Sequence, residues 1–539
     1  MNAHHDNPTE TRRQAIQAAV DATRSAAERN RLGQFATPNA LAIDIARCVD
    51  SLIDDRRRGV RFADPSIGSG SFFSAALAVF GSKRIRSAVG VELDPAFCEA
   101  ARDLWSDTAL EVIQGDFTQV VSYASRPPAP NLILANPPYV RHHHINGEDK
   151  ERLQRLAYEM TGLEVSGLAG LYVYFLLLAT AWMEDGGYAA WLIPSEFMDV
   201  NYGAALKRYL TDRVTLMRAH RFDPDDVQFG DALVSSVVLV FRKAPPPRGH
   251  EAELTFGGTM NEPHASDRIP LERLRESRKW TVYPSHARND RHTVSDGSGP
   301  TLSDFLRIQR GIATGSNKFF VLDRADAKRR ELPEKYLRPI LPSPRHLKTT
   351  VIEGDDDGYP RIDRQLCVID CSLPEHAVEQ RHPALWEYLQ TAAAQGIMDG
   401  YLLGKRSPWY KQEQRTPSPF LCTYMGRGAD EKQPFRFLLN RSKAIGTNLY
   451  LMLYPLNGLA AMLHKHPGRT ADVHELLGRV SGHELRGEGR VYGGGLNKIE
   501  PSELGRISAA PFVERWPELR SSVQRQGELF GDQSREAGA

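Results

Sequence analysis

Strand-like and helical segments alternate regularly between residues 60 and 241, and this alternation constrains the fold more than any other feature. Apolar runs at 60–66, 87–93, 110–117, 131–139 and 188–194 predict strands, and helical patterns separate them. This order predicts a parallel sheet covered by helices on both faces. The last two strands, 215–222 and 235–243, have no helical pattern between them, so we expect one antiparallel edge strand. The sequence thus predicts an α/β fold with a doubly wound, mostly parallel, seven-stranded Rossmann-like sheet.

A second domain is expected because 539 residues are too many for one ordinary core. APPPRGHE (244–251) has the composition of a linker, and the chain beyond it is richer in short strand-like pieces, Pro and Gly. We therefore expect a first domain at 1–245, a second, α+β domain at 246–515, and a C-terminal tail at 516–539.

Positive charge is concentrated in the second half of the chain. Residues 301–350 contain 11 Lys and Arg against 5 Asp and Glu, and residues 401–450 contain 9 against 3. A solvated surface would explain such zones, and so would a polyanionic partner bound there.

The remaining composition favours a cytoplasmic protein without a metal. The five cysteines follow no pattern, the N-terminus has no apolar signal segment, and the longest apolar run, at 171–183, is too short to span a bilayer. The histidine run at 142–144 cannot direct three adjacent side chains at one ion, and GDDDG (354–358) is typical of an acidic surface loop.

A glycine loop follows the first predicted strand in FADPSIGSGSFF (62–73). Gly68 and Gly70 would let a ligand approach the backbone at the start of a helix, and the preceding Asp64-Pro65 is unusual for nicotinamide dehydrogenases. The next strand ends in Glu92, which is where an acid that binds ribose hydroxyls is usually found. A plain structural turn is the alternative reading of this loop.

Asp116 and Phe117 end the third predicted strand at the same edge of the sheet. An acid there can accept a hydrogen bond from an adenine amino group, and a ring can stack on the base. Ordinary core packing would equally explain Phe117. Together with the glycine loop and Glu92, these residues indicate a cofactor that contains adenosine.

The fourth predicted strand ends in a rigid polar hook, Asn136-Pro137-Pro138-Tyr139. In a doubly wound sheet, ligands bind beyond the carboxyl ends of strands, where the strand order reverses. The prolines stiffen the turn, so that the Asn136 side-chain oxygen and the Pro137 carbonyl can accept both hydrogens of a planar amino group. Tyr139 offers a ring for stacking a flat base. The hook therefore predicts a site that holds an amino group.

With these motifs the sequence resembles the gamma-class N6-adenine DNA methyltransferases of bacterial type II restriction–modification systems, the Eco57I/TaqI-like group. GQFATP (33–38) matches a motif that precedes the glycine loop in that class, and VQFGDALVSSVVLVF (227–241) matches a late motif. GLYVYF (170–175) resembles the helix beside the cofactor, and RGIATGSNKFF (310–320) and YGGGLNKIEP (492–501) resemble elements of target-recognition domains. The resemblance is strong over 33–245 and looser over 300–510.

The resemblance implies S-adenosylmethionine as cofactor and direct methyl transfer to N6 of an adenine flipped out of duplex DNA. The implied cofactor-binding residues are Phe35, Ala36, Thr37, Pro38, Asp64, Pro65, Gly68, Gly70, Glu92, Asp116, Phe117 and Asn136. The hook residues Asn136, Pro137, Pro138 and Tyr139 would be catalytic, and Tyr139 and Phe229 would stack on the target base. No covalent intermediate and no strong general base are required.

The implied partners are double-stranded DNA and a separate cognate restriction endonuclease, and we expect a monomer. DNA-binding candidates in the basic zones are Arg307, Arg310, Lys318, Lys405, Arg406, Arg436 and Arg441.

Three other functions remain open at this stage. The same hook can hold the amino group of cytosine, which would give an N4-cytosine methyltransferase. Enzymes that methylate glutamine in release factors, or guanine in ribosomal RNA, share the hook but lack GQFATP and a large C-terminal half. A non-catalytic DNA-binding protein with a decayed cofactor site is the third.

Overall fold

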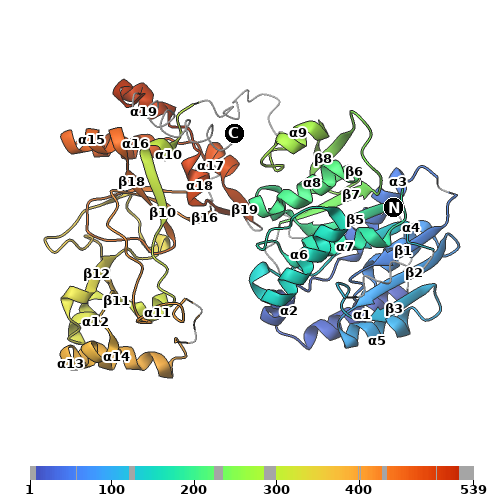
Figure 1. Ribbon diagram of the computed structural model, residues 1–539, viewed down its shortest axis with the longest axis horizontal. Coiled ribbons are helices and arrows are strands. Elements are labelled where there is room, and N and C mark those ends of the chain that lie inside the picture. The colour runs from blue at the N-terminus through green and yellow to red at the C-terminus, as the bar shows by residue number, and fades with distance from the viewer. Residues whose placement is uncertain are drawn as a thin grey trace, which may run out of the picture. The chain divides into compact units, whose positions relative to one another are not determined.

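The chain divides into two compact units. The computed structural model describes residues 8–55, 57–119, 128–223, 235–284, 299–398, 400, 402–427, 434–492 and 495–520 (Figure 1). One unit comprises residues 1–291 with 492–494, and the other comprises 292–491 with 495–539. Each unit is described by itself below.

The first unit is built on one mixed sheet. Its strands are β1 (Val60–Asp64), β2 (Ile85–Glu92), β3 (Leu110–Gln114), β4 (Leu132–Ala135), β5 (Tyr188–Pro194), β6 (Thr215–Arg221), β7 (Ser236–Arg242), β8 (Glu251–Gly258) and β9 (Pro263–Pro270). They lie in the order β3-β2-β1-β4-β5-β7-β6-β8-β9. The pairs among β1 to β5 are parallel, and β7 runs antiparallel to both β5 and β6. The predicted fold class is confirmed, including the antiparallel strand, with two strands more than the seven predicted.

Helices cover both faces of this sheet (Figure 1). They are α1 (Pro8–Ala22), α2 (Ala26–Leu32), α3 (Asn39–Leu52), α4 (Ser71–Phe80), α5 (Pro95–Leu104), α6 (Gly147–Thr161), α7 (Leu171–Ala179), α8 (Ala204–Asp212) and α9 (Leu271–Glu276). Alternate residues of β4 enter different cores. Leu132 and Leu134 pack in a cluster with α3, α4 and α5, whereas Ile133 and Ala135 pack in a cluster with α6, α7 and α8. Burial on both sides explains why the central strands read as continuous apolar runs.

The boundary expected at residue 245 is wrong, because the chain divides after residue 291. β8 pairs in parallel with β6, and β9 pairs antiparallel with β8, so both strands extend the sheet of the first unit. Trp280 is fully buried in the same core, and its backbone N–H donates to the Met198 carbonyl (3.0 Å). The proline-rich segment at 244–251 is therefore a connection within this unit. Long-range pairing with the edge of β6 decides this, and no local pattern records it.

The second unit contains three smaller sheets, with orders β10-β18-β15-β17-β13, β11-β14-β12 and β16-β20-β19. Its strands are β10 (Leu306–Arg310), β11 (Val321–Asp323), β12 (Leu337–Ile340), β13 (Val351–Ile352), β14 (Leu366–Ile369), β15 (Phe420–Thr423), β16 (Met425–Arg427), β17 (Phe437–Asn440), β18 (Tyr450–Pro455), β19 (Arg490–Tyr492) and β20 (Leu496–Lys498). Its helices are α10 (Leu302–Phe305), α11 (Asn317–Phe320), α12 (Arg324–Arg329), α13 (Glu375–Arg381), α14 (Pro383–Ala394), α15 (Asn457–Lys465), α16 (Arg469–Gly478), α17 (Gly482–Glu488), α18 (Pro501–Gly505) and α19 (Ala510–Arg515). This mixture agrees with the α+β character predicted for the second half.

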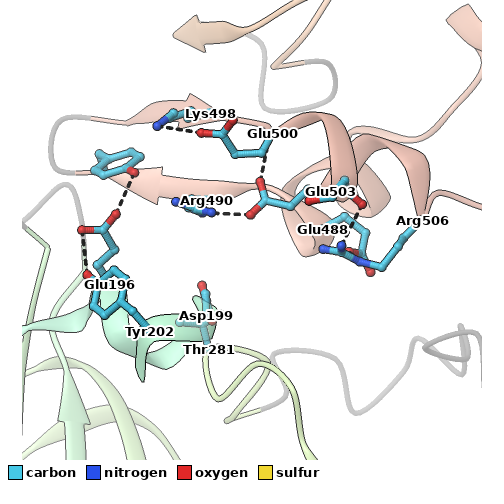
Figure 2. Close-up of polar contacts among 12 residues, drawn as sticks. Glu196, Asp199, Tyr202, Thr281, Glu488, Arg490, Lys498, Glu500, Glu503 and Arg506 are labelled. Atoms are coloured by element: carbon cyan, nitrogen blue, oxygen red, sulfur yellow. Dashed lines mark hydrogen bonds and ion pairs between the residues drawn. The ribbon is translucent and has the colours of Figure 1, made fainter. Parts of the chain in front are cut away.

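Charged side chains on either side of YGGG (492–495) make contacts within the second unit (Figure 2). Arg490 of β19 pairs with Glu503 (2.8 Å), and Lys498 of β20 pairs with Glu500 (3.0 Å). Glu500 and Glu503 also form a capping box at the start of α18, in which the Glu500 N–H donates to the Glu503 carboxylate (2.8 Å). Two short strands and a short helix are thereby held in one arrangement.

The tail was predicted to begin too early, at residue 516. Trp516 is 4% exposed and Leu519 is 1% exposed, and both pack in the core beneath β15 and β18. The β15 and β18 residues of that core lie far away in the sequence, so the burial of Trp516 and Leu519 depends on tertiary packing. Residues 521–539 lie outside the described part of the chain. Within the described ranges, no helix combines the length and apolarity needed to cross a bilayer.

Candidate active site

The glycine loop follows β1, as predicted, and its conformation requires glycine. Gly68 has φ +53° and Gly70 has φ +90°, both in the left-handed region. A Cβ added at Gly70 would lie 2.3 Å from the indole nitrogen of Trp105, so no larger residue fits there. A Cβ added at Gly68 would meet no atom within 4 Å. The loop is therefore closed on the side of Trp105 and open at Gly68.

A buried carboxyl group, Asp64, and a half-buried one, Glu92, end the neighbouring strands β1 and β2. The Glu92 carboxylate accepts from the backbone N–H of Gly68 (2.9 Å) and of Asp94 (2.8 Å). Asp64 accepts from the Ser66 N–H (2.9 Å). Burial, with a smaller contribution from the charge of Glu92, raises the pKa of Asp64 to about 8, and burial also raises the pKa of Glu92. A positively charged ligand would stabilise the ionised form of both groups.

The third strand places its two predicted residues differently. Asp116 accepts from the N–H and the hydroxyl of Thr118 (both 2.8 Å). Phe117 is 1% exposed, and its ring lies 5.0 Å from the rings of both Phe175 and Trp182. Phe117 is thus a core residue in this structure, and its contact with adenine remains a prediction.

The hook follows β4 and is fastened to the loop at 33–38. The Asn136 side-chain nitrogen donates to the Phe35 carbonyl (2.8 Å) and to the Thr37 hydroxyl (3.1 Å). Its side-chain oxygen, Oδ1, is buried and accepts no hydrogen bond from any described residue. The hydrogen bonds of its nitrogen therefore fix the orientation of the Asn136 amide, and its oxygen is left as an unsatisfied acceptor.

GQFATP and the hook are packed together, although a hundred residues separate them. The Tyr139 N–H donates to the Gly33 carbonyl (3.0 Å), and a Cβ at Gly33 would lie 2.3 Å from the Tyr139 nitrogen. The Thr37 carbonyl accepts from the hydroxyl of Ser71 (2.8 Å), the first residue of α4. The structure thus brings Gly33, Phe35 and Thr37 together with the hook and with the first residue of α4. The contact of Phe35, Ala36, Thr37 and Pro38 with the cofactor remains a prediction.

The Tyr139 side chain is buried in this packing and presents little surface to solvent. It is 7% exposed, its hydroxyl donates to the Leu192 carbonyl of β5 (3.2 Å), and its ring centre lies 5.4 Å from that of Phe35. Stacking of Tyr139 on a target base remains a prediction. Phe229, the other predicted stacking residue, lies outside the described residues.

Ser66 links the cofactor half of the site to the hook, and the sequence analysis missed it. Its hydroxyl donates to the Asn136 carbonyl (3.1 Å), while its N–H holds Asp64. Ser66 could have been predicted from its position directly after Asp64-Pro65, in a loop at the point where the strand order reverses.

The basic candidates of the second unit differ in how their side chains are engaged. Arg406 donates to the Thr314 carbonyl (3.0 Å), and Arg436 donates to the Leu347 carbonyl (2.6 Å), so both hold the fold together. Arg441 pairs with Glu353 (2.7 Å). Arg307 lies over Tyr454, Arg310 lies over Tyr424, and Lys318 and Lys405 are exposed.

The first unit can hold a cofactor with a ribose and positive charge. The Glu92 carboxylate presents hydrogen-bond acceptors at the end of β2, the open face at Gly68 leaves room beside the backbone, and the raised pKa values of Asp64 and Glu92 favour a nearby cation. S-adenosylmethionine has these features, and when bound it supplies an electrophilic methyl group on sulfur. Asn136 presents a hydrogen-bond acceptor whose direction is fixed by the contacts of its amide nitrogen with Phe35 and Thr37. The contact of Glu92 with ribose hydroxyls remains a prediction.

Known proteins match both halves of the chain. The family described as Eco57I restriction-modification methylase matches residues 131–228, which include the hook. The family described as type II methyltransferase M.Eco57I, C-terminal domain, matches residues 277–533.

Relatives and a solved structure extend these matches over most of the chain. Type II methyltransferase M.XamI of Xanthomonas campestris pv. amaranthicola is 28% identical over 459 residues, or 83% of this chain and 80% of the relative. Type II methyltransferase M.AccI of Acinetobacter calcoaceticus is 23% identical over 498 residues, or 89% and 85%. The structure of the type IIL restriction-modification enzyme MmeI in complex with DNA has a TM-score of 0.53 and 14% identity. The match covers 82% of this chain but less than two thirds, 65%, of the MmeI chain, and it supports the fold alone.

Both family models are named after Eco57I. The two relatives are also described as type II methyltransferases, and each match covers more than four fifths of this chain. The α/β fold and the glycine loop agree with these matches. The chain belongs to the Eco57I-like family of type II restriction–modification methyltransferases, whose methyl donor is S-adenosylmethionine.

Proposed function

We propose that this methyltransferase transfers a methyl group to N6 of an adenine flipped out of duplex DNA. The unsatisfied Asn136 Oδ1 carries the proposal. A buried acceptor without a donor costs on the order of 1–3 kcal/mol, so such an atom calls for a ligand that supplies one. A planar amino group does so, and a duplex base can bring its amino group into a protein interior only after leaving the stack.

The hook sequence favours adenine over cytosine. Asn-Pro-Pro-Tyr begins with Asn, as the motif does in adenine-specific enzymes, and a motif that begins with Ser would favour N4-cytosine methylation. DNA as substrate is supported by the solved relative MmeI, whose structure was determined in complex with DNA. We further propose that the protein acts as a monomer and protects DNA from a separate cognate endonuclease.

The test combines the purified protein, methyl-labelled S-adenosylmethionine and duplex DNA, followed by digestion to nucleosides. We expect the label in N6-methyladenine. Label in N4-methylcytosine would show that the substrate base is cytosine and not adenine. Label in RNA or protein, when these are offered, would reject DNA as the substrate.

Asn136→Ala should abolish labelling while the protein remains folded, because the oriented acceptor is lost. Asn131→Ala is the matched control, since Asn131 lies at the other end of β4 and both ends of its amide are bonded, to the Arg61 N–H (2.8 Å) and the Gly59 carbonyl (2.9 Å). We expect the control to lose stability and keep activity below its melting temperature. Equal activity in Asn136→Ala and the wild type would contradict the proposed role of the hook.

A further inference from the structure

The N-terminal helix α1 carries an ion pair that is almost completely buried. Arg13 is 3% exposed and Glu10 is 6% exposed, and the guanidinium donates to the carboxylate through Nε (2.8 Å) and Nη2 (2.7 Å). Burial by itself raises the pKa of Glu10, but hydrogen bonds from Arg13 and Ser74 outweigh it and hold the pKa below its usual value. A buried ion pair is weak evidence of a stabilising role, so its partners outside the helix indicate its purpose.

Those partners lie in the cofactor loop. Arg13 Nη1 donates to the Ser69 hydroxyl (2.9 Å), and the same hydroxyl donates to the Gln17 side-chain oxygen (2.8 Å). Glu10 accepts from the hydroxyl of Ser74 in α4 (2.6 Å). Positions 10, 13 and 17 share one face of α1, so a single helix face holds both the loop and the helix that follows it.

Ser69 lies in the most permissive part of the glycine loop, so contacts from outside the loop help to fix its conformation there. It stands between Gly68 and Gly70, both at positive φ, and glycine by itself does little to select one conformation. The Ser69 carbonyl accepts from the Trp105 indole N–H (3.0 Å), so α1 fixes the side chain while Trp105 fixes the backbone.

The same N-terminal segment reaches the ribose acid by a second route. Arg24 pairs with Asp94 and also donates to the side chain of Gln34 (2.7 Å), in GQFATP. The Asp94 N–H donates to Glu92 (2.8 Å). Residues 8–32 therefore contact three loops of the cofactor site.

We propose that residues 8–32 position the cofactor loops, with Arg13 and Gln17 as positioning residues that act through Ser69. The inference deepens the proposed function and rests on it only through S-adenosylmethionine, because neither DNA nor the identity of the methylated base enters the argument.

The principal variant is Glu10→Gln/Arg13→Met, which removes the pair without leaving one charge buried alone. We expect the Kd for S-adenosylmethionine, measured by calorimetry without DNA, to rise at least ten-fold. Hydrogen exchange at the amides of residues 67–71 should accelerate, and kcat/KM for the cofactor should fall far more than kcat at saturating cofactor. Arg13→Lys should restore part of the affinity. The control is Arg12→Met, which removes the same charge from an exposed neighbour and should leave the Kd unchanged.

An unchanged Kd with unchanged exchange at 67–71 would overturn the proposal, and so would a loss of kcat with an unchanged Kd. If the double variant does not fold, Ser69→Ala decides the question, since it removes the attachment and leaves the Glu10–Arg13 pair intact. We expect weaker cofactor binding in Ser69→Ala, and a wild-type Kd would overturn the proposal. The calorimetric titration is done without DNA. Its result therefore does not depend on which base of DNA is methylated, and the two proposals can fail separately.

Discussion

Asp64 is a carboxyl group that the folded protein holds in its neutral form over an unusual pH range. Its pKa is raised to about 8 by burial, whereas an unfolded Asp has a pKa of about 4. Between these values the folded state binds the extra proton, so ionisation costs folded-state stability as the pH rises.

Asp64→Asn removes this cost and keeps an oxygen to accept from Ser66. We expect the variant to gain stability relative to the wild type by about 1.4 kcal/mol for each pH unit between about 4 and about 8, on the order of 5 kcal/mol in all, and the difference to level off above that range. Chemical denaturation at a series of pH values measures it. A difference that does not change with pH would show that Asp64 titrates normally.

A substitution at Gly68 should affect the affinity for the cofactor much more than the stability of the fold. Gly68→Ala forces an L residue into the left-handed region, at about 1 kcal/mol, and adds a methyl group where no atom lies within 4 Å. We expect a small loss of stability and at least a ten-fold loss of S-adenosylmethionine affinity, because the methyl group fills space that we assign to the cofactor.

The matched control is Gly396→Ala in the second unit, where φ is +62° and the space is also open. It should lose similar stability and bind S-adenosylmethionine normally. Thermal unfolding and calorimetry report both quantities, and normal cofactor binding by Gly68→Ala would move the cofactor away from this loop.

At the scale of elements, β8 and β9 determine where the catalytic unit can be cut. A fragment ending at residue 245 leaves the edge of β6 unpaired and removes Leu254, Ile269 and Trp280 from the core. It also removes Glu253, which pairs with Arg218 of β6 (2.7 Å). Exposed strand edges promote aggregation, and losing one large core side chain typically costs about 3–5 kcal/mol.

We expect the 1–245 fragment to aggregate or unfold without cooperativity, and a 1–284 fragment to unfold cooperatively. Gel filtration and circular dichroism distinguish the two. Equal stability of both fragments would show that β8 and β9 are dispensable for the sheet.

At the scale of the whole molecule, the proposed DNA contacts should appear in the salt dependence of binding. Arg310 is exposed, with its guanidinium 4.2 Å from the ring centre of Tyr424. If it contacts a phosphate, Arg310→Ala should weaken DNA binding and reduce the slope of log affinity against log salt by about 1.

Arg441→Ala provides the comparison, because Arg441 already pairs with Glu353 and should change the slope less. Arg436→Ala should mainly lower stability, since its guanidinium holds backbone carbonyls. Binding titrations at several salt concentrations decide, and an unchanged slope in Arg310→Ala would exclude that residue from the contact.

The order of elements in the catalytic sheet and the places of its motifs were predictable from the sequence. Parallel strands that alternate with helices deliver their carboxyl ends to one edge, so Asp64, Glu92 and Asn136 had to lie near one another. The N-terminal residues of the site were not predictable in the same way. Glu10 and Arg13 look like a solvent-facing pair, and only the glycine loop packed over them makes them a buried contact.

Local sequence thus determined which segments form strands and helices, and where the polar hook and the glycine loop interrupt them. Tertiary structure decided what each free edge and face meets: β8 at the edge of β6, Trp516 in the second core, and Phe117 between two aromatic rings. The physical reason is that backbone propensity and periodicity act over a few neighbouring residues. Burial and pairing depend instead on segments that are far apart in the chain and come together only in the folded molecule.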